Sequence, residues 1–232
     1  MKKKTRWPIY LIIGLIITFI AFTVPLPYYI EVPGTSEDIR KVLQVNNQTD
    51  QEEGSYQFVT VGVKHARLVD LVYAWLTPFT DIHSAKEMTG GSSDTEFMRI
   101  NQFYMETSQN MAKYQGLKSA GKEIELKYLG VYVLTVTDNS TFKGILNIAD
   151  TVTAVNDKTF ESSKEMVDYV NSQTLGDKVK VTYQEDGKVK TAEGKIITLE
   201  NGKNGIGIGL IDRTEVSSDV PIKFSTAGIG GP

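Results

Sequence analysis

The residues best suited to chemistry form a short apolar run around one glycine, Tyr128-Leu129-Gly130-Val131. A glycine at such a point lets neighbouring backbone N–H groups converge on an anion such as a carboxylate. The residues that follow, Val131, Tyr132 and Val133, are predicted to form an exposed strand edge with unpaired backbone groups. An extended peptide adds to such an edge as a further strand. The chemistry predicted here is therefore non-covalent capture of a peptide.

A predicted helix over residues 163–171 supplies a second wall for this site. Its apolar face, Met166, Val167 and Val170, would sort the side chains of the bound peptide. A simpler interpretation stays open, in which Leu129, Val131 and Val133 are half-buried strand residues that bind nothing.

Other reactive residue types lack the partners that their chemistry requires. His65 and His83 accompany no H-E-x-x-H, G-x-S-x-G or paired-carboxylate arrangement and are expected to be surface or packing histidines. Ser225 and Thr226 have no visible general base. The glycines of Asn204–Leu210 alternate in an extended run, unlike a dinucleotide fingerprint, and no phosphate-binding G-x-x-x-x-G-K-[ST] loop occurs. We therefore expect no cofactor, metal or nucleotide.

Composition narrows the class of protein further. The chain has no cysteine, which excludes disulfides and thiol nucleophiles. Its net charge of −3, from 25 basic and 28 acidic residues, argues against nucleic acid as a partner. Four of the basic residues lie at the start of the chain, so the remainder carries 21 basic and 28 acidic residues, a formal −7.

The basic start precedes a long uncharged segment, Trp7–Val24. As a helix these residues would extend about 27 Å, close to the hydrocarbon thickness of a bilayer. A cleavable signal peptide would have a shorter apolar core and a small-residue cleavage site. We expect an uncleaved, single-pass signal anchor with residues 1–6 in the cytoplasm and the bulk of the chain outside the cell membrane. Tyr28 and Tyr29 would lie in the outer aromatic belt.

Residues 25–122 are expected to form an extracytoplasmic α/β region. Residues 25–54 are rich in turn formers and allow one short strand at 39–45. Patterning predicts a strand over 55–63 and a helix with Leu68, Leu71, Val72 and Trp75 at helical spacing. Ser93 and Glu96 form a capping box for a helix of roughly 25 residues, whose aromatic and methionine stripe is expected to be core.

Residues 123–200 show short strands and turns with one good helix, the pattern of a small capped β-barrel. The strands are predicted within 124–128, 130–137 and 151–160, and a hairpin turns at Asp186–Gly187. The helix begins after the capping box of Ser162 and Glu165. The chain as a whole is predicted to be α+β.

This stretch resembles a PDZ domain, in the strand order found in exported bacterial proteases. Residues 128–131 match the carboxylate-binding loop of that family. Residues 148–152 with 154–156 match its G-D-x-I-x-x-V-N-G signature, with Ala149 and Asp157 where glycine is usual. The second replacement predicts a differently built turn. The resemblance implies peptide contacts from Tyr128, Leu129, Gly130, Val131, Tyr132, Val133, Met166, Val167 and Val170.

Further segments resemble the membrane-anchored, Lon-like (S16) serine proteases of Gram-positive bacteria. They are PLPYYIEVPG, YAWLTPFT, RINQFYMETSQ and IKFSTAGIGGP. In that family the final proline directly precedes the serine of a Ser-Lys dyad, and Lon enzymes carry Asp where this chain has Gly230. The resemblance implies that residues 201–232 begin a protease domain. They are expected to be loosely ordered because they have nothing to pack on.

The resulting expectation is the peptide-binding part of an ATP-independent Ser-Lys endopeptidase. Its partners would be a secreted signalling peptide of the competence type, or an unfolded polypeptide, and the membrane. The chain itself is expected to bind peptides without cleaving them. The alternative is a membrane-anchored PDZ adaptor that recruits peptides or proteins and catalyses nothing.

Overall fold

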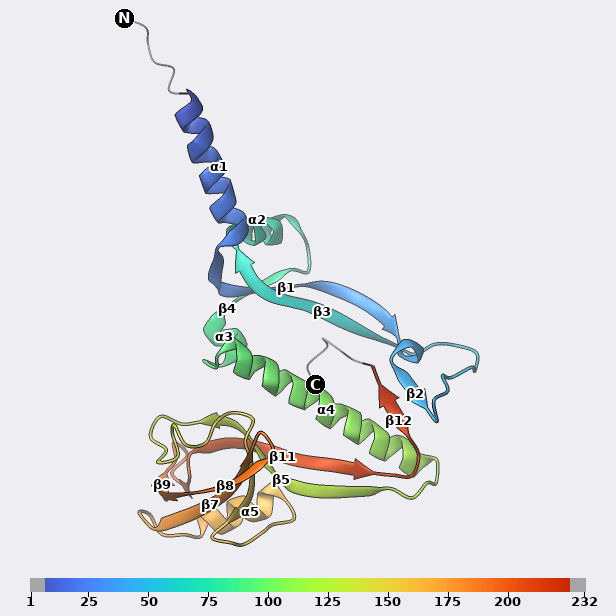
Figure 1. Ribbon diagram of the computed structural model, residues 1–232, viewed down its shortest axis with the longest axis vertical. Helices are drawn as coiled ribbons and strands as arrows, with labels where there is room; N and C mark the ends of the chain where they lie inside the picture. The colour runs from blue at the N-terminus through green and yellow to red at the C-terminus, as the bar shows by residue number, and fades with distance from the viewer. Residues whose placement is uncertain (1–6, 226–232) are drawn as a thin grey trace, which may run out of the picture. The chain divides into compact units, whose positions relative to one another are not determined.

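The computed structural model describes residues 7–225 (Figure 1). The chain divides into two compact units, which are described one after the other. The first contains the residues up to 42 together with 50–93, and the second contains residues 43–49 and those from 94 onward.

The first unit begins with the helix α1 (Trp7–Thr23), in which no residue is buried. The predicted apolar helix is therefore present, one residue shorter than the uncharged segment. Within residues 7–225, no helix is both long enough and apolar enough to cross a membrane.

The rest of the first unit is a three-stranded antiparallel sheet in the order β3-β1-β4 with short helices. Ile30, Tyr29 and Ala66 form its buried centre. Tyr29 packs on His65 with ring centroids 4.3 Å apart, so Tyr29 is not free to join an aromatic belt. The elements are β1 (Pro25–Asp38), a 3-10 turn (Ile39–Lys41), β3 (Gln57–Arg67), α2 (Leu68–Leu76), β4 (Asp81–Ser84) and α3 (Ala85–Thr89).

The long strand β1 corrects the prediction of a turn-rich segment with one strand at 39–45. Prolines at 25, 27 and 33 are unusual within a long strand, because proline cannot donate a ladder hydrogen bond. The pairing of β1 with β3 accommodates them by shifting register between Pro25 and Tyr29 and again between Pro33 and Ser36. Only Leu43–Val45 of the predicted strand is extended, as β2.

The second unit is built on a five-stranded antiparallel sheet in the order β11-β5-β6-β7-β8. Val131, Val133, Val152 and Val181 are fully buried on one face of this sheet, where Met166 and Val170 of the helix α5 join the same core. The elements are β5 (Glu125–Val136), β6 (Thr151–Val155), α5 (Ser163–Asn171), β7 (Lys178–Glu185), β8 (Lys188–Lys195) and β11 (Ile208–Ser217).

The long helix α4 (Asp94–Ser119) packs on the other face of β5. The ring of Phe103 stacks on Tyr132 at a centroid distance of 3.7 Å. The predicted core stripe is only partly correct, because Met111 is exposed and the other members, Phe97, Ile100, Tyr104 and Tyr114, are half-buried. Short strands complete the unit, namely β9 (Ile197–Thr198) with β10 (Asn204–Gly205), and β2 (Leu43–Val45) with β12 (Ile222–Phe224).

Several local predictions for residues 123–200 are confirmed. The Asp186–Gly187 turn joins β7 to β8, and both of its residues have positive φ, as a type I′ hairpin turn requires. The hydroxyl of Ser162 accepts a hydrogen bond from the N–H of Glu165 at the start of α5. The two strands predicted within 124–137 are one continuous strand, β5, because Gly130 continues the extended chain instead of ending it.

The described residues after 200, 201–225, do not lack a packing partner, contrary to expectation. β11 pairs with β5 along its whole length, and Ile208 and Leu210 pack against the core of the sheet. Residues 204–210 are strand and loop, as predicted. Thr226 and the GGP segment lie outside the described residues.

Candidate peptide-binding groove

The edge of β5 that was expected to be open is occupied by the chain itself. β11 runs antiparallel along it, with Leu210 opposite Val133, Asp212 opposite Val131 and Arg213 opposite Gly130. The prediction of unpaired backbone groups at Val131–Val133 is therefore wrong. The sequence pattern identified a strand that accepts another strand, but not the segment that it accepts.

β11 also contacts α5, so it lies against both predicted walls of the groove. The carboxylate of Asp212 accepts a hydrogen bond of 2.8 Å from the backbone N–H of Ser163, the first residue of α5. A carboxylate at this point satisfies a free helix N–H and interacts favourably with the helix dipole. The Asp212 carboxylate of β11 thus lies at the N-terminus of α5, and the carboxylate nest around Gly130 stays a prediction.

Two further hydrogen bonds attach β11 on the opposite face of the sheet. Nη1 of Arg213 donates to Oγ1 of Thr151, a buried hydroxyl on β6, at 2.5 Å. Nδ2 of Asn110 on α4 donates to the carbonyl oxygen of Thr214 at 3.2 Å. β11 is therefore held by backbone pairing with β5, by a backbone N–H of α5 and by side chains of β6 and α4.

Gly130 has a steric role in this arrangement. Its φ of +136° disfavours residues with a side chain, and a Cβ placed there would lie 2.3 Å from the carbonyl oxygen of Val152. β6 passes too close for any other residue. The approach of Val152 therefore makes residue 130 a position that stabilises the fold.

The predicted contact residues on β5 divide between the two faces of the sheet. Val131 and Val133 point into the core, whereas Tyr132 lies against α4, and its hydroxyl is 3.4 Å from the carbonyl oxygen of Arg99. Leu129 is half-buried. These strand residues pair with β11 through their backbones. Because the side chain of Tyr132 lies on the face of the sheet that α4 covers, it is turned away from α5.

On α5, the predicted contacts also differ in exposure. Met166 and Val170 are buried in the core of the sheet, and Val167 is half-buried. The apolar face of α5 therefore stabilises the domain as well as forming one wall of the groove. The assignment of all nine residues as peptide contacts stays a prediction.

Tyr128 lies at the end of the groove where Asp212 binds. Its Oη is buried, and no described residue provides a hydrogen-bond partner for it. Burial, with a smaller effect from the negative charges of Asp212 and Glu165, raises the pKa of Tyr128 to about 12. An unpaired buried hydroxyl lowers stability, because it loses its hydrogen bonds to water on folding.

Tyr128→Phe should therefore raise the free energy of unfolding, by about 1 kcal/mol at pH 8. The folded pKa exceeds the unfolded value of about 10, so the wild type loses stability as the pH rises from about 10 toward 12. The variant should lose less over that range. Urea denaturation at pH 8 and pH 11 measures both effects, with the exposed Tyr56→Phe as control. A destabilised variant at pH 8 would contradict this account of Tyr128.

The two replaced glycines of the signature keep the backbone that glycine would adopt. Ala149 has a φ of +82°, and Asn156 and Asp157 have φ of +51° and +62°. Asn and Asp tolerate the left-handed region, so the turn forms without glycine at position 157. Asp157 also accepts a hydrogen bond of 2.8 Å from Lys180.

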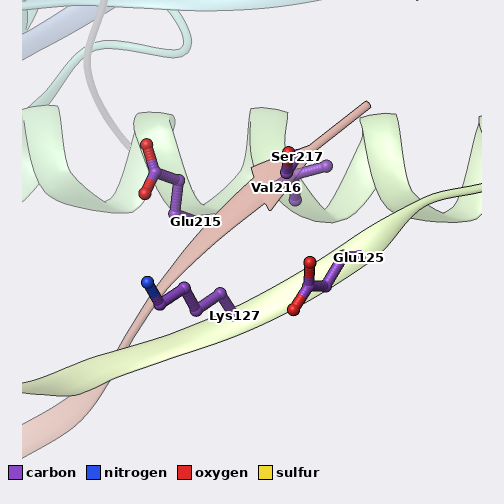
Figure 2. A pocket seen from close by; sticks show the side chains of 5 residues that line it. All are labelled: Glu125, Lys127, Glu215, Val216 and Ser217. Carbon is purple, nitrogen blue, oxygen red and sulfur yellow. The ribbon is translucent and has the colours of Figure 1, made fainter. Parts of the chain in front are cut away.

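A shallow pocket lies at the outer end of the β5–β11 ribbon (Figure 2). Figure 2 shows side chains of opposite charge from the two strands along its lining. The lining residues are Glu125, Lys127, Glu215, Val216 and Ser217. The mixed charge and the openness to solvent give this pocket no clear ligand, and it lies at the end of β5 away from Val136.

Sequence reasoning missed Asp212, Ser163, Arg213 and Thr151, which fasten β11. The alternation of residues 208–217 predicts a strand, but its partner is about 80 residues earlier in the chain. Because residues 201–232 were expected to begin a following domain, the pairing of β11 with β5 was not predicted.

Comparison with known proteins identifies this unit. Residues 101–196 match the PDZ domain family, so the chain contains a PDZ domain. The match begins within α4, earlier than the predicted boundary at 123. No curated protein matches the chain.

Solved structures of PDZ domains from Listeria are similar to this chain. The PDZ domain of an SdrC-like protein from Listeria monocytogenes is 35% identical, and the alignment covers 38% of this chain and 93% of that one, with a TM-score of 0.36. The PDZ domain of an SdrC-like protein from Listeria innocua is 38% identical, with 35% and 92% covered and a TM-score of 0.34.

Proposed function

We propose that the PDZ domain binds extended peptides at the edge of β5, in exchange for β11. The observation that carries this proposal is the antiparallel pairing of β11 along β5, beside α5. The chain's own strand demonstrates that this edge accepts an extended segment. PDZ domains bind peptides by the same strand addition.

The position of β11 also defines which peptides would fit. Leu210 packs against the core, and Asp212, two residues later on the same face, places a carboxylate at the N-terminus of α5. The groove should therefore favour an apolar residue followed two positions later by an anionic group, either an acidic side chain or a terminal carboxylate.

Disulfide trapping tests the exchange, because the chain has no cysteine of its own. The probe is a synthetic peptide of residues 206–217 with cysteine in place of Glu215, added to full-length Lys127→Cys protein. Lys127 and Glu215 are paired across the strands. We expect a mixed disulfide in glutathione buffer, and much less with a peptide whose cysteine replaces Ile206 instead.

The double variant Lys127→Cys/Glu215→Cys provides the control. Once oxidised it should hold β11 in place and bind no labelled peptide, and reduction should restore binding. A lock at Thr182→Cys/Thr191→Cys, a pair between β7 and β8, should leave binding unchanged. Equal trapping at both peptide positions, or peptide binding to the locked protein, would refute exchange at this edge.

We further propose that the peptide is the substrate of a Ser-Lys endopeptidase at the cell surface. Its support is the resemblance of PLPYYIEVPG and IKFSTAGIGGP to the Lon-like proteases, and a secreted signalling peptide is the substrate proposed. Incubating the complete gene product with secreted peptides and weighing the products tests this. Peptides that bind but stay intact would favour the adaptor instead.

The proposed localisation is the cell membrane, with α1 as the anchor. All its large apolar side chains, from Trp7 to Phe22, are exposed, and an apolar surface of this extent is unstable in water. At about 1.5 Å per residue its 17 residues extend about 26 Å, near the lower limit for a spanning helix. Resistance of the full chain to carbonate extraction would support the anchor.

A further inference from the structure

A second apolar surface lies on α2, in the same unit as α1. Five large side chains occupy one face of the helix and the turn that follows it. Trp75 and Phe79 are the most exposed, at 85% and 87%. The five are Leu68, Val72, Trp75, Leu76 and Phe79, which we call the α2 patch.

The helix is oriented so that its apolar side faces outward. Asp70, on the opposite side, is buried, where it accepts a 2.8 Å hydrogen bond from Lys64 Nζ and another of 2.8 Å from the N–H of Arg67. These bonds hold the pKa of Asp70 below its usual value, against its burial. Asp70 is the only charged residue between Leu68 and Thr80, so the outward face carries no charge.

The turn after α2 extends the same surface. Phe79 has a φ of +59°, a conformation that bulky residues rarely adopt, and it projects an aromatic ring into solvent. Strained backbone of this kind clusters at functional sites.

The helix that carries the α2 patch lies against α1. The two helices contact one another, and Figure 1 shows α2 beside the C-terminal end of α1. If α1 is the anchor proposed above, that end lies at the membrane surface, and α2 lies at the depth of the lipid headgroups. Tryptophan and phenylalanine with leucine on an uncharged face are typical of helices that lie in this interface.

We propose that the α2 patch binds the surface of the lipid bilayer, as a second contact beside α1. This inference rests on the anchor in the proposed function. The contact would fix the orientation of the first unit on the membrane, because a helix that spans and a helix that lies in the interface together restrict rotation.

The two tryptophans of the chain report separately on the two contacts. Full-length Trp7→Phe, reconstituted in phosphatidylcholine vesicles, leaves Trp75 as the reporter of the patch. Trp75→Phe leaves Trp7 as the reporter of α1. Spin-labelled lipid should quench most of the Trp75 emission, which should also be shifted to the blue and protected from iodide.

The outcomes are distinct. Lipid quenching of Trp7 but not of Trp75 would overturn the inference and leave the anchor intact, whereas quenching of neither would overturn both. Blue-shifted Trp75 emission without lipid quenching, dependent on protein concentration, would assign the patch to a second copy and overturn lipid binding.

Charged substitutions within the patch provide the matched comparison. Leu76→Glu/Phe79→Glu, in the Trp7→Phe background, should abolish the quenching of Trp75 by lipid. Val59→Glu/Val61→Glu changes two exposed valines on β3 and serves as the control. Val59 lies about 26 Å along the strand from Arg67. This double variant should leave the quenching of Trp75 by lipid unchanged. Equal effects of the two double variants would refute a contact specific to α2.

Discussion

Gly130→Ala should lower the free energy of unfolding of the PDZ unit by about 2–4 kcal/mol. Two costs add together at this position. The φ of +136° strains any residue with a Cβ, and that Cβ would overlap the carbonyl oxygen of Val152 at 2.3 Å. Because the obstacle is backbone in the central strand β6, the clash is relieved only by moving β6 away from β5.

Urea denaturation, followed by circular dichroism, measures this cost. Gly144→Ala is the matched control, since Gly144 also has positive φ, +76°, but open space around its Cβ position. The difference between the two variants combines the clash with Val152 and the greater backbone strain of φ +136° over φ +76°. If both lose the same stability, the close approach of β6 does not decide the identity of residue 130.

Local structure in the PDZ unit could be predicted because single residues determine it. Asp186–Gly187 specifies a hairpin turn through its positive φ angles, and Ser162 specifies the start of α5 through one hydrogen bond. Both signals act within four residues. They do not depend on what the rest of the chain does, so the sequence pattern was sufficient.

Pairing between distant strands was not predictable in the same way. The residues of β11 indicate a strand, but nothing in their alternation identifies β5 as its neighbour. The prediction for the segment that forms β1 was wrong for another reason. Its prolines are accommodated by two register shifts in the pairing of β1 with β3. Both errors concern the partner of a strand, which tertiary packing determines.

The sequence pattern of α2 also did not predict which face of the helix is buried. The spacing of Leu68, Val72 and Trp75 correctly predicts a helix, and such a stripe usually faces a core. In this helix the buried Asp70, paired with the exposed Lys64, occupies the inner side and the stripe faces outward. One buried charge thus reverses the interpretation of several apolar residues.

In the proposed exchange, β11 and the added peptide compete for the same edge of β5. A tethered strand competes with a free peptide at an effective concentration that is typically millimolar. The apparent affinity for peptide therefore depends on how firmly β11 is attached. Access of a peptide to β5 is therefore controlled by the contacts that hold β11 in place. The relevant contacts are those that the peptide can replace with its own residues.

Asp212→Ala should consequently strengthen the binding of added peptide by about tenfold. Loss of the hydrogen bond to Ser163 N–H and of the charge at the N-terminus of α5 costs β11 about 1–2 kcal/mol. The labelled peptide of residues 206–217 keeps its own aspartate, so its intrinsic affinity is unchanged and its apparent Kd falls by the factor that β11 loses.

Fluorescence anisotropy with this peptide measures the change. Glu215→Ala, which removes the same charge from an exposed position of β11, should leave the apparent Kd unchanged. A peptide with alanine in place of its aspartate should bind about tenfold more weakly to wild type and variant alike. If folded Asp212→Ala protein binds the original peptide no more tightly than wild type, β11 is a permanent strand of the sheet, because its release does not limit access to β5.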